Sequence, residues 1–322
     1  MRPYTQLTQE QRYQIYAFLK VGFSQSAVSL EVGVHKSTIS RELRGNRGKK
    51  GYHPKQAHAL AVRRRSQATK FIKMTAQLVD IIANLIRQDL SPEQVSGFLR
   101  KTQQINISHE TIYQYVRSDK ANGGTLFRHL RRSNRKRKKR YGSQNRRGQI
   151  RDRVSIDDRP AIVNTKKRTG DWEIDTLIGK GHKGSLLTLV ERKTKYTIIK
   201  KLPDRQARSV ADATLDLLSP FSKKVFTITS DNGKEFAQHH RISHQLKADV
   251  YFAHPYHAWE RGLNENTNGL IRQYFPKKTD FESITEEKVL FVMDRLNNRP
   301  RKTLGFTSPS EMFFSSLNKK AA

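Results

Sequence analysis

The chain has 322 residues, and its 62 Lys and Arg against 29 Asp and Glu give a formal net charge of +33 at pH 7. It contains no cysteine, which excludes disulfides, thiolate zinc sites and thiol nucleophiles. There is no run of about 18 apolar residues and no signal-peptide pattern at the N-terminus. A charge of this size predicts a polyanionic partner, and nucleic acid is the first expectation. A ribosomal-type protein or an anionic-membrane binder is the alternative, disfavoured by a patterned apolar C-terminal half and the lack of a basic amphipathic anchor.

The first 50 residues predict a helix-turn-helix domain. Residues 8–20 have apolar groups at helical spacing, with Thr8 as N-cap and Arg12 on the polar side. A short helix after Ser24 and a turn at Gly33 lead to a third helix at 37–44. A helix, a glycine turn and a polar-faced helix are typical of major-groove recognition. The outward side chains expected to contact DNA are Ser37, Thr38, Ser40, Arg41 and Arg44. An ordinary three-helix bundle is the alternative.

Residues 51–130 predict a second helical region. A basic helix is expected at 55–65 and an amphipathic helix at 74–87. Ser91-Pro92 then starts a helix at 93–100, followed by another at 108–116. This pair is a weaker helix-turn-helix candidate, and a packing or dimerisation bundle is the competing interpretation. The expected DNA contacts here are His109, Thr111 and Gln114.

Residues 131–160 predict a basic linker. From Arg131 to Arg140 nearly every residue is Lys or Arg, and apolar residues almost vanish. Such a segment cannot bury a core, and we expect it to follow the phosphate backbone of DNA. Its candidate contacts are Arg135, Arg137 and Lys138. A localisation signal or a solubilising linker is the alternative.

Residues 161–322 predict a mixed sheet flanked by helices. Strand patterns at 172–178, 186–191 and 196–202 suggest an antiparallel meander. A helix at 207–218, a strand at 225–230, a helix at 233–246 and a strand at 250–253 follow. Helices are expected from about 260 to 274 and at 283–298. The predicted fold class is therefore multidomain: helical helix-turn-helix domains, then an α/β catalytic domain of the ribonuclease-H-like type.

Three acidic residues stand out in this half, because carboxylates within the fold of a strongly basic, DNA-binding protein indicate a specific role. Asp175 lies within the first strand, Asp231 follows the strand at 225–230, and Glu265 opens a helix. Three hard oxygen ligands from three elements suit Mg²⁺ or Mn²⁺. Two such ions about 4 Å apart can hold the attacking and leaving oxygens of a phosphodiester. We therefore expect Asp175, Asp231 and Glu265 to be the catalytic metal ligands.

Other acids compete for these roles. Asp171 and Glu173 point the same way as Asp175 by strand alternation, and a salt bridge to a nearby Arg is the structural alternative for Glu173. Glu260 competes with Glu265. We prefer Glu265 because helical spacing places it on one face with Asn268, Gly269 and Arg272, whereas Glu260 has no such neighbours.

At this point the chain resembles transposases of the insertion sequence 30 family, a branch of the DDE transposases and retroviral-integrase-like enzymes. The similarity covers essentially the whole chain. The motifs that carry it are Trp172-Glu173-Ile174-Asp175, Thr229-Ser230-Asp231-Asn232-Gly233, Asn264-Glu265-Asn266-Thr267-Asn268-Gly269, Arg272-Gln273-Tyr274-Phe275-Pro276-Lys277 and Leu296-Asn297-Asn298-Arg299-Pro300-Arg301-Lys302. Presumed catalytic positions show no departure. His254 stands where the family leads us to expect Asp, and we interpret it as tolerated variation.

The resemblance implies a DNA transposase that binds terminal inverted repeats, cleaves a strand and joins the released 3′-hydroxyl to another phosphodiester. It implies a circular intermediate with abutted ends and a homodimer or higher homo-oligomer on double-stranded DNA. It makes Asp175, Asp231 and Glu265 ligands of Mg²⁺ or Mn²⁺, with two ions expected. Asn268, Arg272 and Lys277 are expected to hold DNA. A cytoplasmic, nucleoid-associated bacterial protein is the expected setting.

Two other functions are weighed against this one. The first is a non-enzymatic DNA-binding regulator descended from a transposase, and the presence of all three acids argues against such decay. The second is a ribonuclease acting on RNA–DNA hybrids, which shares the predicted fold. Two segments suited to reading duplex DNA count against it.

Overall fold

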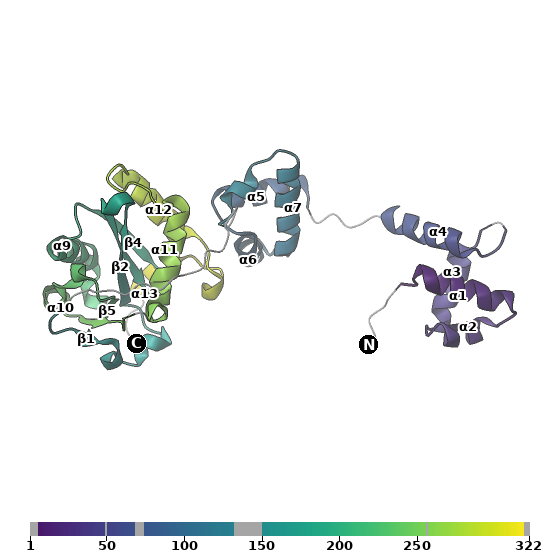
Figure 1. Ribbon diagram of the computed structural model, residues 1–322, viewed down its shortest axis with the longest axis horizontal. Helices are drawn as coiled ribbons and strands as arrows, with labels where there is room; N and C mark the ends of the chain where they lie inside the picture. Colours follow the sequence, from purple (N-terminus) through teal and green to yellow (C-terminus); the bar gives the residue numbers. More distant parts are fainter. Residues whose placement is uncertain (1–5, 49, 68–73, 132–149, 256, 319–322) are drawn as a thin grey trace. The chain divides into compact units, whose positions relative to one another are not determined.

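A computed structural model describes residues 6–48, 50–67, 74–131, 150–255 and 257–318. The chain forms two compact units, Met1–Lys73 and Met74–Ala322. Figure 1 follows the chain from its helical N-terminal part to the sheet of the second unit. The expected boundaries at 50, 130 and 160 stay predictions.

The first unit consists of helices α1 (Gln9–Lys20), α2 (Gln25–Glu31), α3 (Lys36–Asn46) and α4 (Pro54–Gln67). Thr8 and Gln11 form the capping box expected at the start of α1, and Ser24 caps α2. Gly33 has a φ of +69°, which explains why glycine makes this turn. The core contains Leu7, Ile15, Val28, Val32 and Ile39. The predicted helix-turn-helix arrangement is confirmed.

Arg12 corrects one detail of the sequence interpretation. We placed it on the polar side of α1, but only 2% of the residue is exposed. Its Nε and Nη2 donate to the two carboxylate oxygens of Glu42 at 2.7 and 3.1 Å, and Nη1 donates to the carbonyl of Leu7 at 2.7 Å. This ion pair joins α1 to α3. Helical periodicity predicted that Arg12 faces solvent, but its side chain is buried against Glu42 of another helix.

The second unit begins with α5 (Ala76–Arg87), α6 (Pro92–Gln103), α7 (His109–Ala121) and the 3₁₀ helix η1 (Leu126–His129). Ser91 forms a capping box with Gln94, as its place before Pro92 predicted. Buried aliphatic residues including Ile82, Val95 and Ile112 join these helices in one core.

Six strands form one mixed sheet in the order β1-β6-β5-β2-β3-β4. The strands are β1 (Val154–Ser155), β2 (Asp171–Ile178), β3 (Ser185–Glu191), β4 (Thr197–Leu202), β5 (Thr227–Ser230) and β6 (Asp249–Phe252). The β2-β3-β4 meander is antiparallel, as predicted. Strand β5 pairs with β2 and β6 in parallel, and β6 pairs with β1 in parallel. The two-residue strand β1 was not predicted.

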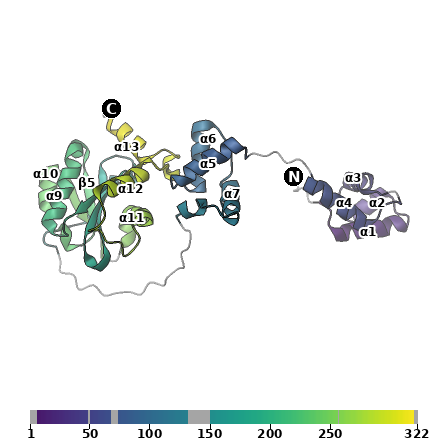
Figure 2. The ribbon, with the colours of Figure 1, turned by 90° about the horizontal axis from the view of Figure 1, so that it is seen from above.

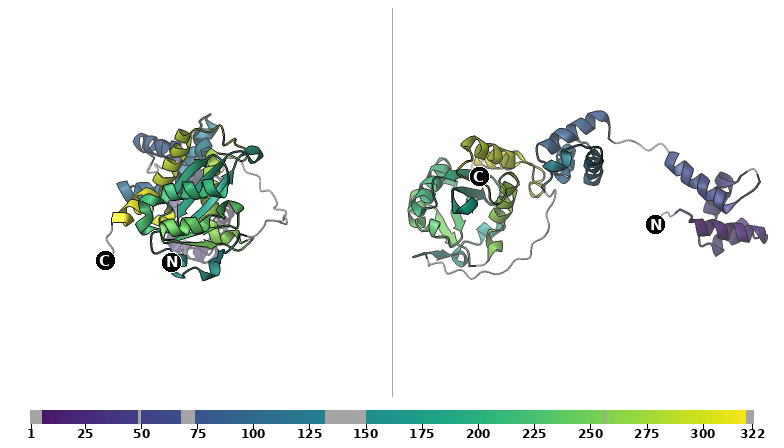
Figure 3. Two further views of the ribbon diagram at one scale, coloured as in Figure 1. Left: turned by 90° about the vertical axis from the view of Figure 1, so that its left-hand side faces the viewer. Right: turned by 45° about the horizontal axis from the view of Figure 1, so that its top comes forward.

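Helices cover both faces of this sheet (Figures 1–3). Helices α9 (Ala207–Leu218) and α10 (His239–Leu246) lie on one face, and α11 (Gly262–Tyr274) and α12 (Glu286–Asn298) on the other. Alternation along β2 divides its side chains accordingly. Trp172 and Ile174 join the core under α9 and α10, whereas Leu177 joins the core under α11 and α12. Asp175 shares the second face.

The remaining elements are short or terminal. They are α8 (Ile162–Thr165), α13 (Pro309–Asn318), η2 (Ile156–Asp158), η3 (Lys180–His182), η4 (Ser219–Lys224), η5 (Lys234–Phe236), η6 (Ala258–Arg261) and η7 (Lys302–Leu304). The helix predicted at 233–246 is divided into η5 and α10. Phe313 of α13 packs into the core of the sheet, stacked on Tyr196 at 4.4 Å between ring centroids. None of the described helices combines the length and apolar character that crossing a membrane requires.

Candidate active site

Two neighbouring parallel strands place Asp175 and Asp231 side by side. Glu173 of β2 pairs with Thr229 of β5. Continuing that register by two residues brings Asp175 opposite Asp231, at the point where β5 ends. The carboxylate of Asp231 is held by the backbone N–H of Gly233, which donates to its Oδ1 at 2.9 Å. A Cβ on Gly233 would lie 2.5 Å from Oε2 of Glu235 and 2.9 Å from Oδ1 of Asp231, so a side chain at this position would have to shift one or both of these carboxylates.

A guanidinium lies between the two aspartates. Nη1 of Arg261 is 3.5 Å from Oδ2 of Asp175, and Nη2 is 3.3 Å from Oδ2 of Asp231. Only 14% of the Arg261 side chain is exposed. One cation therefore neutralises both carboxylates in this structure. The sequence interpretation missed Arg261, although its position four residues before Glu265 was a usable signal.

Asp175 is held by polar neighbours at both oxygens. The N–H of Thr176 donates to Oδ1 at 2.9 Å, and Nδ2 of Asn268 donates to Oδ2 at 2.9 Å. Thr188 donates in turn to Oδ1 of Asn268 at 3.2 Å, which fixes the amide's orientation. Burial raises the pKa of Asp175 from 3.8 to about 6. The Asp175 carboxylate is held in one orientation and is largely shielded from water, so a cation beside it strongly stabilises its charged form.

Glu265 is exposed in the first turn of α11. Helical spacing puts it four residues after Arg261 and three before Asn268, and both of these side chains contact Asp175. It therefore lies on the side of α11 that faces the aspartates. Arg261 contacts both Asp175 and Asp231, and Asn268 contacts Asp175.

The competing acids on β2 have structural partners. Glu173 is 1% exposed, forms an ion pair with buried Arg192 and accepts the backbone N–H of Asn264 at 2.9 Å. Asp171, also 1% exposed, pairs with Arg168 at 2.8 Å. Glu173 therefore forms a salt bridge with an arginine, as the structural alternative predicted. Glu173 joins β2, the end of β3 and the start of α11, which steadies the helix that carries Glu265.

The residues expected to bind DNA are placed as follows. Ser40, Arg41 and Arg44 are exposed on α3, with Ser37 and Thr38 half-buried beside them. On α7, His109 and Gln114 are exposed and Thr111 is half-buried. Arg135, Arg137 and Lys138 lie outside the described residues.

Three expected DNA contacts lie on or after α11. Lys277 is exposed. Arg272 donates to the carbonyl of Ile178 at 3.0 Å. Asn268 is engaged by Asp175 and Thr188, so in this structure its amide supports the carboxylate instead of pointing outward.

Comparisons with known proteins give two domain matches and several full-length relatives. Residues 166–258 match the integrase core domain family, and residues 3–46 match a helix-turn-helix domain family. The transposase for insertion sequence element IS4351 of Bacteroides fragilis is 43% identical over 98% of this chain and 97% of its own length. Transposase InsI for element IS30A of Escherichia coli strain K12 is 37% identical over 97% of this chain and 84% of its own length.

Among solved structures, the catalytic core domain of BIV integrase is 22% identical, with a TM-score of 0.37 over 46% of this chain and 95% of that chain. The full-length relatives and the two domain matches decide the assignment. The chain therefore belongs to the family of insertion-sequence transposases that includes those of IS4351 and IS30, with a helix-turn-helix region followed by an integrase core.

Proposed function

We propose that this transposase cleaves DNA at the ends of its element and joins the freed 3′-hydroxyl to a second phosphodiester, with Asp175, Asp231 and Glu265 as ligands of divalent metal. The observation that carries the proposal is the guanidinium of Arg261 between Asp175 and Asp231. Two carboxylates from adjacent strands share one cation there. A site built in this way favours positive charge.

The donor set fits a metal of the Mg²⁺ class. All three side chains offer carboxylate oxygens, which Mg²⁺ and Mn²⁺ prefer, and Asp231 has 34% of its side chain exposed, which leaves access. When bound, one or two such ions would stabilise the negative charge that develops on the phosphodiester oxygens.

The chain's own residues orient the site. Asn268 and the N–H of Thr176 hold the Asp175 carboxylate, and the N–H of Gly233 holds that of Asp231. A metal ion held by the two aspartates would take the place of the Arg261 guanidinium between them. Arg261 would then be able to pair with a phosphate of the DNA in the same site.

The N-terminal part supplies recognition in this proposal. The exposed face of α3 with Ser40, Arg41 and Arg44 reads the terminal inverted repeat, and α7 adds a second contact. Two ends must be held together for joining, so we propose a homodimer or larger assembly on DNA and a circular intermediate with abutted ends.

The test is a strand-transfer assay on an inverted-repeat substrate with Mg²⁺ or Mn²⁺. We expect Asp231→Asn and Glu265→Gln to abolish cleavage and joining while DNA binding persists. Glu287→Gln, an exposed acid on α12, is the matched control and should keep full activity. Wild-type protein that binds the repeat and never cuts would support the regulator instead. Cleavage confined to the RNA strand of a hybrid would support the ribonuclease.

A further inference from the structure

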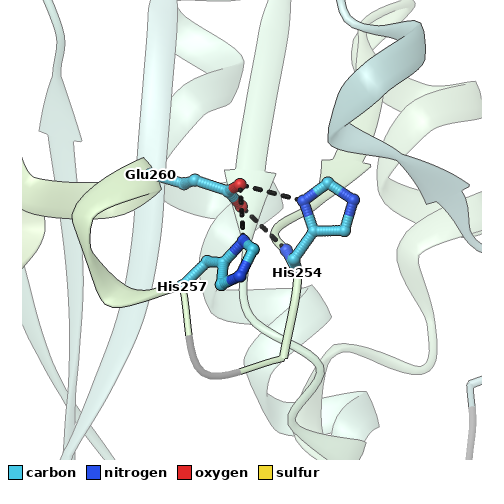
Figure 4. A group of neighbouring side chains, drawn as sticks. All are labelled: His254, His257 and Glu260. Atoms are coloured by element: carbon cyan, nitrogen blue, oxygen red, sulfur yellow. Dashed lines mark hydrogen bonds and ion pairs between the residues drawn. The ribbon is translucent and has the colours of Figure 1, made fainter.

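A second group of potential ligands lies between β6 and α11 (Figure 4). Nδ1 of His254 is 2.9 Å from Oε1 of Glu260, and Nδ1 of His257 is 3.2 Å from the same oxygen. Each of these three side chains offers one possible metal-ligand atom, and the three atoms lie within 4.8 Å of one another; no other such group of His and acidic residues occurs among the described residues. The sequence interpretation left Glu260 without partners, and the structure supplies two imidazoles.

His254 has its other ring nitrogen committed elsewhere. Nε2 lies 2.9 Å from Oδ2 of Asp157, in the 3₁₀ helix η2. An Nε2–H donating to that carboxylate leaves the Nδ1 lone pair directed at His257 and Glu260. Carboxylate, histidine and metal in this order are the usual way in which a protein fixes the tautomer and orientation of a ligating histidine.

Glu260 is also held in place, because the backbone N–H of His254 donates to its Oε2 at 2.8 Å. Oε1 remains for the two imidazoles. The His257 ring stacks on Trp259 with 4.3 Å between centroids, which limits its rotation. Exposed fractions of 36% for His254 and 43% for His257 leave a path for an ion, while Glu260 is 17% exposed.

We propose that His254, His257 and Glu260 bind one divalent transition-metal ion of the Zn²⁺ class. Two imidazole nitrogens and one carboxylate oxygen are the ligands that Zn²⁺ prefers, whereas Mg²⁺ prefers oxygen alone. Ligands about 2.0–2.1 Å from a tetrahedral zinc lie about 3.3 Å apart. The two imidazole nitrogens lie 2.9 and 3.2 Å from Oε1 of Glu260, close to this spacing, and all three ligand atoms lie within 4.8 Å of one another.

The ion would steady the start of α11. Glu260 directly precedes Arg261, whose guanidinium joins Asp175 and Asp231. A metal ion bound by His254, His257 and Glu260 would link the end of β6 to η6. Metal binding itself does not depend on the catalytic proposal.

A proton is the competing occupant. Both ring nitrogens of His254 face carboxylates, so an imidazolium satisfies the same geometry without metal, and the hydrogen bond to Glu260 raises the pKa of His254. Direct metal binding decides between the two. The measurement is Zn²⁺ titration of the full chain after chelator treatment, by calorimetry, with Co²⁺ absorption as a second readout of nitrogen ligation.

We expect wild-type protein to bind one Zn²⁺ that the double variant His254→Asn/His257→Asn does not bind. The matched control His182→Asn/His244→Asn removes two exposed histidines elsewhere and should keep that ion. Asp157→Asn should weaken binding about 10–100-fold, as loss of a carboxylate behind a ligating histidine does. This side chain is 70% exposed, so the fold should survive its replacement.

A last variant separates this site from the catalytic carboxylates. Asp175→Asn/Asp231→Asn should bind Zn²⁺ at His254 and His257 as wild type does, even if it neither cleaves nor joins DNA. Equal stoichiometry and affinity in wild type and the His254→Asn/His257→Asn variant would overturn the proposal. So would loss of the ion in the aspartate variant.

Discussion

Replacing Asp175 with Asn should make the metal-free protein more stable while removing its activity. The pKa of Asp175 is raised by burial from 3.8 to about 6. At 1.36 kcal/mol per pKa unit, keeping the carboxylate ionised in the fold costs about 3 kcal/mol. Asn removes that charge but leaves the Nδ2 of Asn268 facing another amide, which costs about 1 kcal/mol. The expected gain at pH 8 is therefore about 2 kcal/mol.

The sign of the pH dependence follows from the direction of this shift. Below pH 3.8 the carboxyl is protonated in folded and unfolded chains alike, and it costs the fold nothing. The cost of the Asp175 charge grows as pH rises from 3.8 to about 6 and is constant above that. The advantage of Asp175→Asn should thus be full at pH 8 and vanish at pH 4.

Urea unfolding with chelator present measures this difference. Fluorescence of Trp172, buried in β2, and of Trp259 reports on the unit that carries the site. Asp216→Asn, at an acid with 69% of its side chain exposed, is the control and should change stability by less than about 0.5 kcal/mol. Mg²⁺ should stabilise wild type and not Asp175→Asn. A variant less stable than wild type at pH 8, or a difference that is the same at pH 4 and pH 8, would refute the reasoning.

Three further predictions concern stability and DNA binding. Arg192→Met leaves the buried carboxylate of Glu173 unpaired and should lower the free energy of unfolding by about 3–5 kcal/mol in urea, and a loss below 1 kcal/mol contradicts the assigned ion pair. Phe313→Ala empties a core position stacked on Tyr196 and should lower the same quantity by about 3–5 kcal/mol, whereas an unchanged melting temperature would show that α13 does not hold the sheet. Arg44→Ala should reduce the slope of log affinity against log salt by about 1 in fluorescence anisotropy with duplex DNA, and an unchanged slope would remove Arg44 from the DNA contact.

Local patterns in the sequence predicted most of the elements because they depend on near neighbours. Period-two alternation located β2, and the Asp-Asn-Gly turn located the end of β5. Capping residues such as Ser24 and Ser91 marked helix starts that the structure contains. These signals need only a few adjacent residues.

Local sequence patterns could not predict which side chains from distant segments contact each other. Arg12 read as a surface residue because its partner Glu42 lies on another helix. Glu260 looked isolated because its partner His254 comes from the end of β6, and Arg261 gave no sign that it would lie between two aspartates. Such contacts depend on the tertiary arrangement that brings these segments together.

The central claim is that Asp175, Asp231 and Glu265 together hold metal beside DNA. Anomalous scattering from Mn²⁺ in crystals of the full chain with terminal-repeat DNA tests it most directly. The account predicts Mn²⁺ coordinated by all three carboxylates next to a phosphodiester, with Arg261 displaced from between the aspartates. Mn²⁺ bound elsewhere on a fully formed DNA complex, with Arg261 still joining Asp175 and Asp231, would contradict it.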